Sequence, residues 1–296
     1  MNLNIKVLAP KEHDDNRDYG DCFIINDNGK VIVYDCGSEE LAEMVLYYLN
    51  TNGIDKIDVV LSHNDEDHFN GIPKLIEANV VNSITTLLLL KYVKKIKEKV
   101  NDDRVTEDSI KRHILEMYSN ISKLSGQNLI DALEQNNLSP NVKIVGPSEN
   151  YFINAVAKQF TPSESDNIDK STIMNAISVQ LEVNIENKKL LLTGDADVAA
   201  FDDKLTAYDG IQLPHHGNST MAESIFEINE GNNEVLYIVS DNKGKNVNGG
   251  SDELNTKGHH IINTKTGTLD VDYTTFTIER TGNLFCNEIY FDRQKH

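Results

Sequence analysis

Residues 57–71 read IDVVLSHNDEDHFNG, an apolar run that ends in the motif His63-x-Asp65-x-Asp67-His68. A buried strand in front of this motif would hold the following loop at a fixed place and angle. Imidazole and carboxylate groups together suit a divalent transition metal. Two histidines and two aspartates in one turn are more ligands than one ion takes from a single loop. The stretch therefore predicts two ions, with further ligands from elsewhere in the chain.

Two other interpretations of this stretch involve no transition metal. Asp and Asn are common turn residues, so the motif alone is also compatible with a solvated acidic turn. A calcium loop of the EF-hand type needs an oxygen ligand at position 5 and glycine at position 6. Counted from Asp65, position 5 is Phe69 and Gly71 falls at position 7. The calcium loop is excluded, and the acidic turn stays open on this stretch alone.

The chain has 296 residues, of which 39% are hydrophobic, which is enough for one large domain or two small ones. Its densest apolar patch, Leu87–Leu90, is too short to span a bilayer, and Met1–Lys6 lacks the apolar region of a signal peptide. The cysteines show no CxxC spacing and indicate reduced core residues; they are Cys22, Cys36 and Cys286. We therefore expect a cytoplasmic protein without a membrane segment.

The formal net charge of the chain is −19. Proteins that bind nucleic acid broadly do so with Lys and Arg, which release counterions from the phosphates, so this charge argues against an extended grip on duplex DNA. It does not exclude a nucleic-acid or nucleotide substrate, because bound divalent ions bring their own local positive charge. For most of the surface, the acidity indicates only solubility.

Apolar alternation and helical spacing predict an α/β order with an antiparallel start. Asn28-Gly29 is a strong hairpin signal, and Gly53 is expected to end the first helix. Loops are expected at 161–171 and 242–250, and a terminal hairpin over 261–268 and 269–278. The predicted strands are 3–8, 22–25, 30–37, 57–61, 80–90, 141–145, 178–185, 189–193 and 235–239, and the predicted helices are 39–50, 69–78 and 198–207.

Residues 91–137 differ in character from the rest and are predicted to be a helical insertion. Five lysines cluster between Lys91 and Lys99, apolar residues follow at helical spacing from Ile110, and a short helix is expected over 128–135. A lid, a substrate clamp, a dimer surface or a contact with a protein partner are all compatible with this pattern. A neutral packing elaboration with a solvated lysine face is equally compatible.

Two further clusters of candidate ligands follow apolar segments. Gly194-Asp195 comes directly after the strand 189–193, and His215-His216-Gly217 follows residues 211–214. Alone, Asp195 is also compatible with a helix N-cap, and the His-His-Gly segment with a turn that carries one core histidine. Because the loops beyond strand ends build the active sites of α/β proteins, the clusters together predict a two-metal centre.

This set of motifs resembles the metallo-β-lactamase superfamily, and in particular the hydrolase-like domain of the ComEC competence protein and its stand-alone relatives. The resemblance covers about 3–80 and 175–275, and it is carried by the segments Gly20-Asp21, Asp35-Cys36-Gly37, Ser62–Gly71, Leu191–Asp195 and His215–Ser219. It implies an αββα four-layer sandwich of two mixed β-sheets within a single domain over 1–296, with the metals at one edge.

Carried over by position, the resemblance implies a role for each candidate ligand. His63 and Asp65 would hold the first metal. Asp67, His68 and His216 would hold the second, and Asp195 would bridge the two. His215 is either a ligand or a neighbour of one. Asp35 would orient a ligand, and Asn175 stands about where the family has another histidine. The implied catalytic residues are Asp67, His68 and Asp195.

The chain departs from the wider superfamily at the first metal. The usual second histidine is Asp65, as in ComEC-like chains, and the histidine expected before the strand 189–193 is replaced by Asn175. The first site therefore has one histidine and more oxygen donors, which shifts the preference toward manganese or magnesium, with zinc still compatible. Two divalent ions, Zn or Mn with Mg as a further candidate, are the predicted cofactors.

We expect a metal-dependent phosphodiesterase or nuclease that acts on nucleic acid or a nucleotide. Two ions about 3.5–4 Å apart can share a water and lower its pKa to near 7, so no serine or cysteine nucleophile is needed. The nucleic-acid preference is implied by the ComEC-like resemblance. Two alternatives remain open: a hydrolase of esters, thioesters or lactones, and a metal-bound scaffold or sensor with little catalysis.

Overall fold

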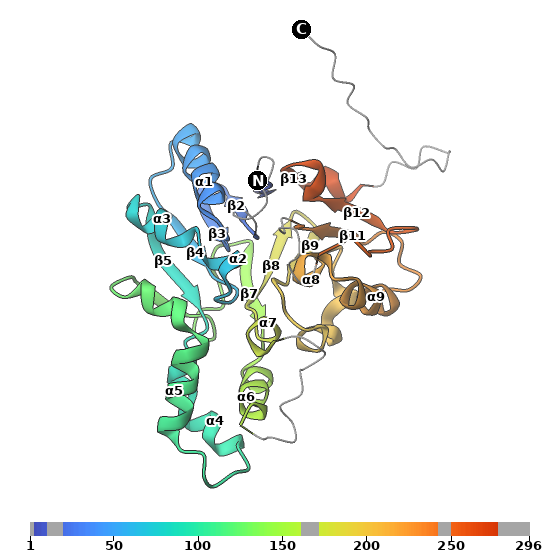
Figure 1. Cartoon of the computed structure of the whole chain (residues 1–296). Helices are drawn as coiled ribbons and strands as arrows, with labels where there is room; N and C mark the ends of the chain where they lie inside the picture. Colours follow the sequence, from blue (N-terminus) through green and yellow to red (C-terminus); the bar gives the residue numbers. More distant parts are fainter. Residues whose placement is uncertain (1–2, 11–19, 161–171, 242–249, 278–296) are drawn as a thin grey trace.

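The computed structural model describes residues 3–10, 20–160, 172–241 and 250–277. Two β-sheets lie face to face, with α1 and α3 outside one sheet and α9 outside the other (Figure 1). This arrangement is the predicted αββα sandwich, and the fold prediction is confirmed. The expected loop at 161–171, most of the loop at 242–250 and the last residue of the expected terminal hairpin fall outside the described residues.

The first sheet has the strand order β13-β1-β2-β3-β4-β5-β6. Strands β1 to β3 and β13 pair antiparallel, and β3 to β6 pair parallel. The Asn28-Gly29 turn joins β2 to β3, as the hairpin signal predicts. The strands are β1 Leu3–Val7, β2 Phe23–Asp27, β3 Lys30–Tyr34, β4 Ile57–Val60, β5 Val81–Thr86, β6 Leu129–Asp131 and β13 Leu269–Val271.

The second sheet has the strand order β12-β11-β10-β9-β8-β7. Its strands β9 to β12 pair parallel, and β7 to β9 pair antiparallel. Both sheets are therefore mixed. The strands are β7 Val142–Gly146, β8 Gln180–Ile185, β9 Lys188–Leu192, β10 Gly210–Gln212, β11 Leu236–Val239 and β12 His260–Asn263.

Helix α1 begins and ends at residues that satisfy its terminal backbone groups. At the start of α1, the Ser38 side chain accepts a hydrogen bond from the backbone N–H of Leu41, and Gly53 ends the helix with φ at +65°. The helices are α1 Glu39–Asn52, α2 Glu66–Phe69, α3 Ile72–Glu77, α4 Val93–Lys99, α5 Glu107–Met117, α6 Glu149–Lys158, α7 Ile173–Ala176, α8 Pro214–Gly217 and α9 Ser219–Ile228.

Alternation along the central strands divides the apolar residues between layers. On β3, Ile32 and Tyr34 lie in the core between the sheets, while Val33 packs on the side of α1 and α3. On β9, Leu190 and Leu192 lie between the sheets, while Leu191 packs on the side of α9. The two sheets are thus buried on both faces, and polar groups concentrate where the strands end.

Several predicted elements differ from the structure. Residues 87–90 do not continue β5, because the chain turns into a 3₁₀ helix at Leu89–Tyr92. The helix expected over 128–135 is wrong: β6 occupies 129–131 and pairs parallel with β5. The terminal hairpin is also wrong, since β12 pairs with β11 in the second sheet and β13 with β1 in the first. Short apolar runs do not distinguish strand from helix, which explains the first two errors.

The segment predicted as a helical insertion contains α4, α5 and 3₁₀ turns at Leu89–Tyr92 and Ser119–Leu124 before β6. In Figure 1, α4 and α5 lie below the strands of the first sheet. The helix expected over 198–207 consists of two 3₁₀ helices, Val198–Ala200 and Asp202–Ala207. Within the described ranges, no helix has both the length and the apolar character needed to cross a bilayer.

Candidate metal centre

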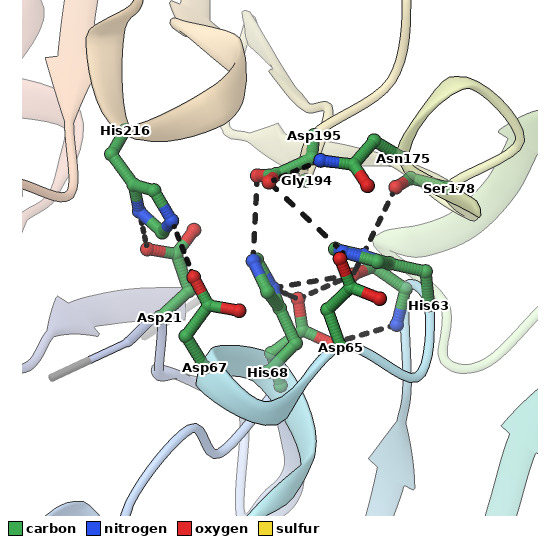
Figure 2. A network of polar contacts seen from close by, with 12 residues as sticks. Asp21, His63, Asp65, Asp67, His68, Asn175, Ser178, Gly194, Asp195 and His216 are labelled. Carbon is green, nitrogen blue, oxygen red and sulfur yellow. Dashed lines mark hydrogen bonds and ion pairs between the residues drawn. The ribbon is translucent and has the colours of Figure 1, made fainter. Parts of the chain in front are cut away.

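Four parallel strands end at the same edge of the sandwich, and the predicted ligands lie just beyond them. Asp35 follows β3, the His63–His68 loop follows β4, Asp195 follows β9 and His216 follows β10. Figure 2 shows the side chains of His63, His68, Asp195 and His216 converging from both sheets. The rings of His63, His68 and His216 lie in a row, with centroid separations of 4.2 Å and 5.5 Å between successive rings.

Two groups of three residues could each hold an ion. In both groups, one ligand atom per residue lies within 4.8 Å of the others; the groups are His63, His68 and Asp195, and Asp67, His68 and His216. His68 belongs to both groups, so the two lie side by side around its ring. All the members are buried except Asp67, which is partly buried.

The hydrogen bonds of His63 assign its tautomer. The Ser62 hydroxyl donates to Asp35 Oδ2 at 2.6 Å, so its oxygen is left to accept from His63 Nδ1 at 3.0 Å. The Ser178 hydroxyl also lies 3.2 Å from Nδ1. Because Nδ1 carries the proton, Nε2 has a lone pair, which is the form that binds a metal. In this structure His63 Nε2 is buried and has no hydrogen-bond partner.

His68 and His216 are oriented in the same way. His68 Nδ1 lies 2.8 Å from Asp35 Oδ2, and His216 Nδ1 lies 3.0 Å from Asp21 Oδ1 and 3.1 Å from the Ser240 carbonyl. These partners are acceptors, so both Nδ1 atoms donate and both Nε2 atoms face the centre, where His216 Nε2 lies 2.9 Å from Asp67 Oδ2. A carboxylate behind a ligating imidazole is the usual outer partner of a metal-binding histidine.

Asp195 lies between the two sides of the centre. Its Oδ1 is 3.4 Å from His68 Nε2, and its Oδ2 is 4.0 Å from His63 Nε2. Asn175 Nδ2 donates to Oδ2 at 3.2 Å, and Thr172 donates to Asn175 Oδ1. Asn175 thus presents a donor to Asp195, and its oxygen is already bonded. In place of a ligand, the asparagine supplies an amide that orients the carboxylate.

The donor set fits a divalent cation. Nε2 of His63 and of His68 and Oδ1 of Asp195 are buried atoms without a hydrogen bond. Buried polar atoms are nearly always paired, and three unpaired ones that face each other have a common explanation in an ion that they would bind. The residues present therefore match the predicted cofactor class.

Two predicted ligands lie outside both groups. Asp65 Oδ2 is 3.7 Å from His63 Nε2, and its side chain is 43% exposed, so it borders the centre on the solvent side. His215 precedes His216 in a turn where both have positive φ, at +53° and +57°. Burial lowers the pKa of His215. Its ring centroid is 6.0 Å from that of His216, and it belongs to neither ligand group.

The charges of the centre compensate each other. Burial alone would lower the pKa of His68, yet Asp195, Asp35 and Asp67 raise it well above the usual value. Burial alone would also lower the pKa of His216, yet Asp21 and Asp195 raise it well above the usual value. Against the effect of burial, the histidines hold the pKa of Asp67 and of Asp195 below the usual range. A cation that binds here competes with protons, so its affinity rises with pH.

Two glycines place Asp67 by close backbone approach. A Cβ on Gly20 or on Gly37 would lie 2.0 Å from the Asp67 carbonyl oxygen. The same oxygen accepts from Asp21 N at 2.9 Å, and the His68 carbonyl accepts from Cys36 N at 2.9 Å. The turn at Gly20-Asp21 and the turn after β3 therefore position Asp67 and His68, the second half of the metal loop.

Asp21, Ser178 and Gln212 act at this centre without having been predicted to do so. Asp21 binds His216, and Gln212 Nε2 donates to Asp21 Oδ2 at 2.9 Å. Gln212 Oε1 accepts from the backbone N–H groups of Thr193 and Gly194. The Gly20-Asp21 turn was the available signal for Asp21, since it belongs to the motif set. Neither Ser178 nor Gln212 carries a comparable motif.

Residues 15–116 match the sequence model of the metallo-beta-lactamase superfamily. No curated protein matches the chain in sequence. The match covers the turn at Gly20-Asp21, the Asp35–Gly37 segment and the whole metal loop. The ComEC-like subtype is a finer assignment, and it stays a prediction.

Solved structures share the fold across most of the chain. YhfI from Bacillus subtilis, a metallo-beta-lactamase fold protein, is 12% identical with a TM-score of 0.51, and the match covers 91% of this chain and 100% of YhfI. Tm1679, a metal-dependent hydrolase of the beta-lactamase superfamily, is also 12% identical with a TM-score of 0.51, covering 92% of this chain and 99% of Tm1679. The chain is therefore similar in sequence to the metallo-beta-lactamase superfamily over residues 15–116, and it shares the fold of these two structures over most of its length.

Proposed function

We propose that the chain is a metal-dependent hydrolase that cleaves phosphodiester bonds in nucleotides or short single-stranded nucleic acid. The observation that carries the hydrolase proposal is the set of three buried atoms without a hydrogen bond, on His63, His68 and Asp195, at the edge where the parallel strands end. Divalent ions bound there would polarise the scissile group and lower the pKa of water to near 7.

The protein's own groups orient the ligands and exclude competing chemistry. Asp35, Asp21 and Asn175 hold the ligands His68, His216 and Asp195 in place. Among the described residues, a thiolate nucleophile is disfavoured, because burial raises the pKa of Cys22 well above the usual value and Cys36 is fully buried as well. The attacking group in this proposal is therefore water.

Hard donors favour phosphodiester chemistry. The carboxylates of Asp195 and Asp67 belong to the two ligand groups, and carboxylate oxygens favour Mn²⁺ or Mg²⁺, which suit phosphate oxygens. Asp65 and Asn175 stand where the superfamily resemblance implies two histidines, so fewer nitrogen donors are present. The net charge of −19 argues against long duplex DNA.

The lysine-rich stretch Lys91–Lys99 adds little to the proposal. Lys91 pairs with Glu134 at 2.8 Å, Lys95 pairs with Glu149 at 2.5 Å, and Lys97 donates to the Asp102 carbonyl at 3.2 Å. The two glutamates neutralise Lys91 and Lys95, and Lys97 is bonded within the segment. We therefore assign the stretch no role in substrate binding.

The test is an activity assay of purified protein loaded with Mn²⁺, Mg²⁺ or Zn²⁺. The substrates are bis-p-nitrophenyl phosphate, single-stranded DNA, RNA and a lactone. We expect phosphodiester cleavage by the wild type, and loss of both cleavage and metal content in His68→Ala and Asp195→Ala. His260→Ala, on the far strand β12, is the matched control and should keep both.

Three results would contradict the proposal, each at a different level. Lactone cleavage with intact phosphodiesters would overturn the substrate class and favour a carbon-ester hydrolase. No cleavage of any substrate, with the same metal content in the wild type and in both ligand variants, would overturn the metal centre itself. Metal bound by the wild type without cleavage would favour the scaffold or sensor.

A further inference from the structure

The metal loop has two separate supports. Its second half, Asp67 and His68, lies against the turns at Gly20-Asp21 and Cys36-Gly37 through backbone hydrogen bonds. Its first half contains His63, Asn64 and Asp65, and its neighbour is the segment Met117–Lys123, which comprises the end of α5 and most of the following 3₁₀ helix Ser119–Leu124. The first support precedes β4 in the sequence, and the second lies between β5 and β6.

Asn64 is held by this segment from both sides. Its Nδ2 donates to the Met117 carbonyl at 2.9 Å, and its own carbonyl accepts from Asn120 Nδ2 at 2.8 Å. Met117 is the last residue of α5, so its carbonyl is one of those that a helix leaves without an internal partner. Asn64 is 4% exposed, and bonds made at such a site are costly to lose.

The segment is attached to the core through Tyr118 and through Leu124, which follows it. Tyr118 is buried in the core between the sheets with Ile110 and Ile114. Leu124, just beyond the segment, is buried in the core on the other face of the first sheet. Lys123 Nζ lies 5.5 Å from the ring centroid of Phe69 at the end of the metal loop.

Tyr118 also lies close enough to Asp65 to be affected by its charge. Burial raises the pKa of the Tyr118 hydroxyl, and the Asp65 carboxylate raises it further. The direct contacts of the segment reach residues 64 and 69 of the loop.

We propose that Met117–Lys123 positions the His63–Asp65 half of the centre, with Asn64 and Asn120 as positioning residues. The proposal rests on the proposed metal centre. It gives this part of the insertion a function, where the sequence leaves a lid, a clamp and a neutral elaboration open. It also predicts that the two halves of the centre respond differently, because only the first half depends on Asn120.

The experiment compares wild type with Asn120→Ala and Asn120→Asp. Asn120→Ala removes the donor to the Asn64 carbonyl, and Asn120→Asp keeps the shape but replaces the donor with an acceptor. Asn101→Ala, at an exposed asparagine of the same insertion, is the matched control. Circular dichroism establishes that each variant is folded.

The first readout needs no metal. Hydrogen exchange of the metal-free proteins should be faster in peptides covering 63–69 for both Asn120 variants, with exchange in β4 and in Asn101→Ala unchanged. The backbone N–H groups of His68 and Phe69, which donate to the Asp65 carbonyl at 3.0 Å, are the reporters. Unchanged exchange over 63–69 in both variants would overturn the proposal whatever the chain does with metals.

The second readout is Mn²⁺ binding, followed by the free-ion signal in electron paramagnetic resonance. We expect two binding events in the wild type, and one of them weakened about 10- to 100-fold in both Asn120 variants. Equal weakening of both events, or an Asn120→Asp variant that binds like wild type, would contradict the proposal. If the wild type itself bound no Mn²⁺, the proposed function would fail first, and the positioning role would fall with it.

Discussion

Asp35 has a left-handed backbone conformation, with φ at +58°, and its carboxylate accepts three hydrogen bonds. Aspartate tolerates this conformation better than most residues, at some cost in strain. The donors are the backbone N–H and the hydroxyl of Ser62 and Nδ1 of His68. Through them, Asp35 determines the tautomers of both His63 and His68, although it need not contact an ion.

We expect Asp35→Asn to weaken metal binding about 10- to 100-fold while the fold is retained. The new amide group would face the Ser62 hydroxyl and His68 Nδ1 with a donor, so His68 would shift its proton to Nε2 and lose the lone pair that binds a metal. A chelator-competition titration measures the change. Asp58→Asn in β4, where Asp58 binds Asn82 and Ser83, is the control, and equal affinities in the two variants would contradict the argument.

At the scale of the elements, the centre depends on how closely three loops approach each other. Gly37 follows β3 and lies against the Asp67 carbonyl, so the turn after β3 and the metal loop are in direct backbone contact. We expect Gly37→Ala to lower the free energy of unfolding by about 1–3 kcal/mol and to weaken the metal site that includes Asp67.

Urea unfolding and Mn²⁺ titration test this expectation together. Gly231→Ala is the comparison, because Gly231 has φ at +84° and open space around its Cβ position. That variant should lose some stability from backbone strain and keep its metal affinity. Normal metal binding by Gly37→Ala would show that the close approach does not position Asp67.

The sequence predicts strands best where alternation and a turn signal agree, as in the hairpin around Asn28-Gly29. The prediction from sequence fails at 128–135, because a short apolar run does not show that residues 129–131 form a strand beside β5. The candidate ligands were found because each follows a strand. Asp21 was not assigned a role, because its partner His216 is 195 residues away and only the packing of the two sheets brings them together.

Across the whole molecule, a net charge of −19 concentrates negative groups that repel each other, and the centre contributes several of them. The ligand histidines reduce this repulsion when they are protonated. The pKa values of His68 and His216 are raised by the surrounding carboxylates, and those of Asp67 and Asp195 are lowered by the histidines. The metal-free molecule and the metal-bound molecule should therefore differ in their pH dependence.

A histidine with a raised pKa stabilises the fold fully below its unfolded pKa of about 6.5, and this contribution is lost as the pH rises through the folded value. A carboxyl group with a lowered pKa stabilises above about 4, and its contribution is lost as the pH falls through the folded value. All four groups therefore stabilise the metal-free protein between about pH 4 and 6.5.

We expect the melting temperature of the metal-free protein in EDTA to be several degrees higher at pH 5.5 than at pH 8, at about 2–4 °C per kcal/mol. Mn²⁺ should reverse this order, since protons compete less for the ligands at pH 8. Differential scanning calorimetry measures both effects, and the His68→Asn, His216→Asn double variant should show a smaller pH difference in EDTA. A metal-free wild type that melts higher at pH 8 would mean that these four groups do not control its stability.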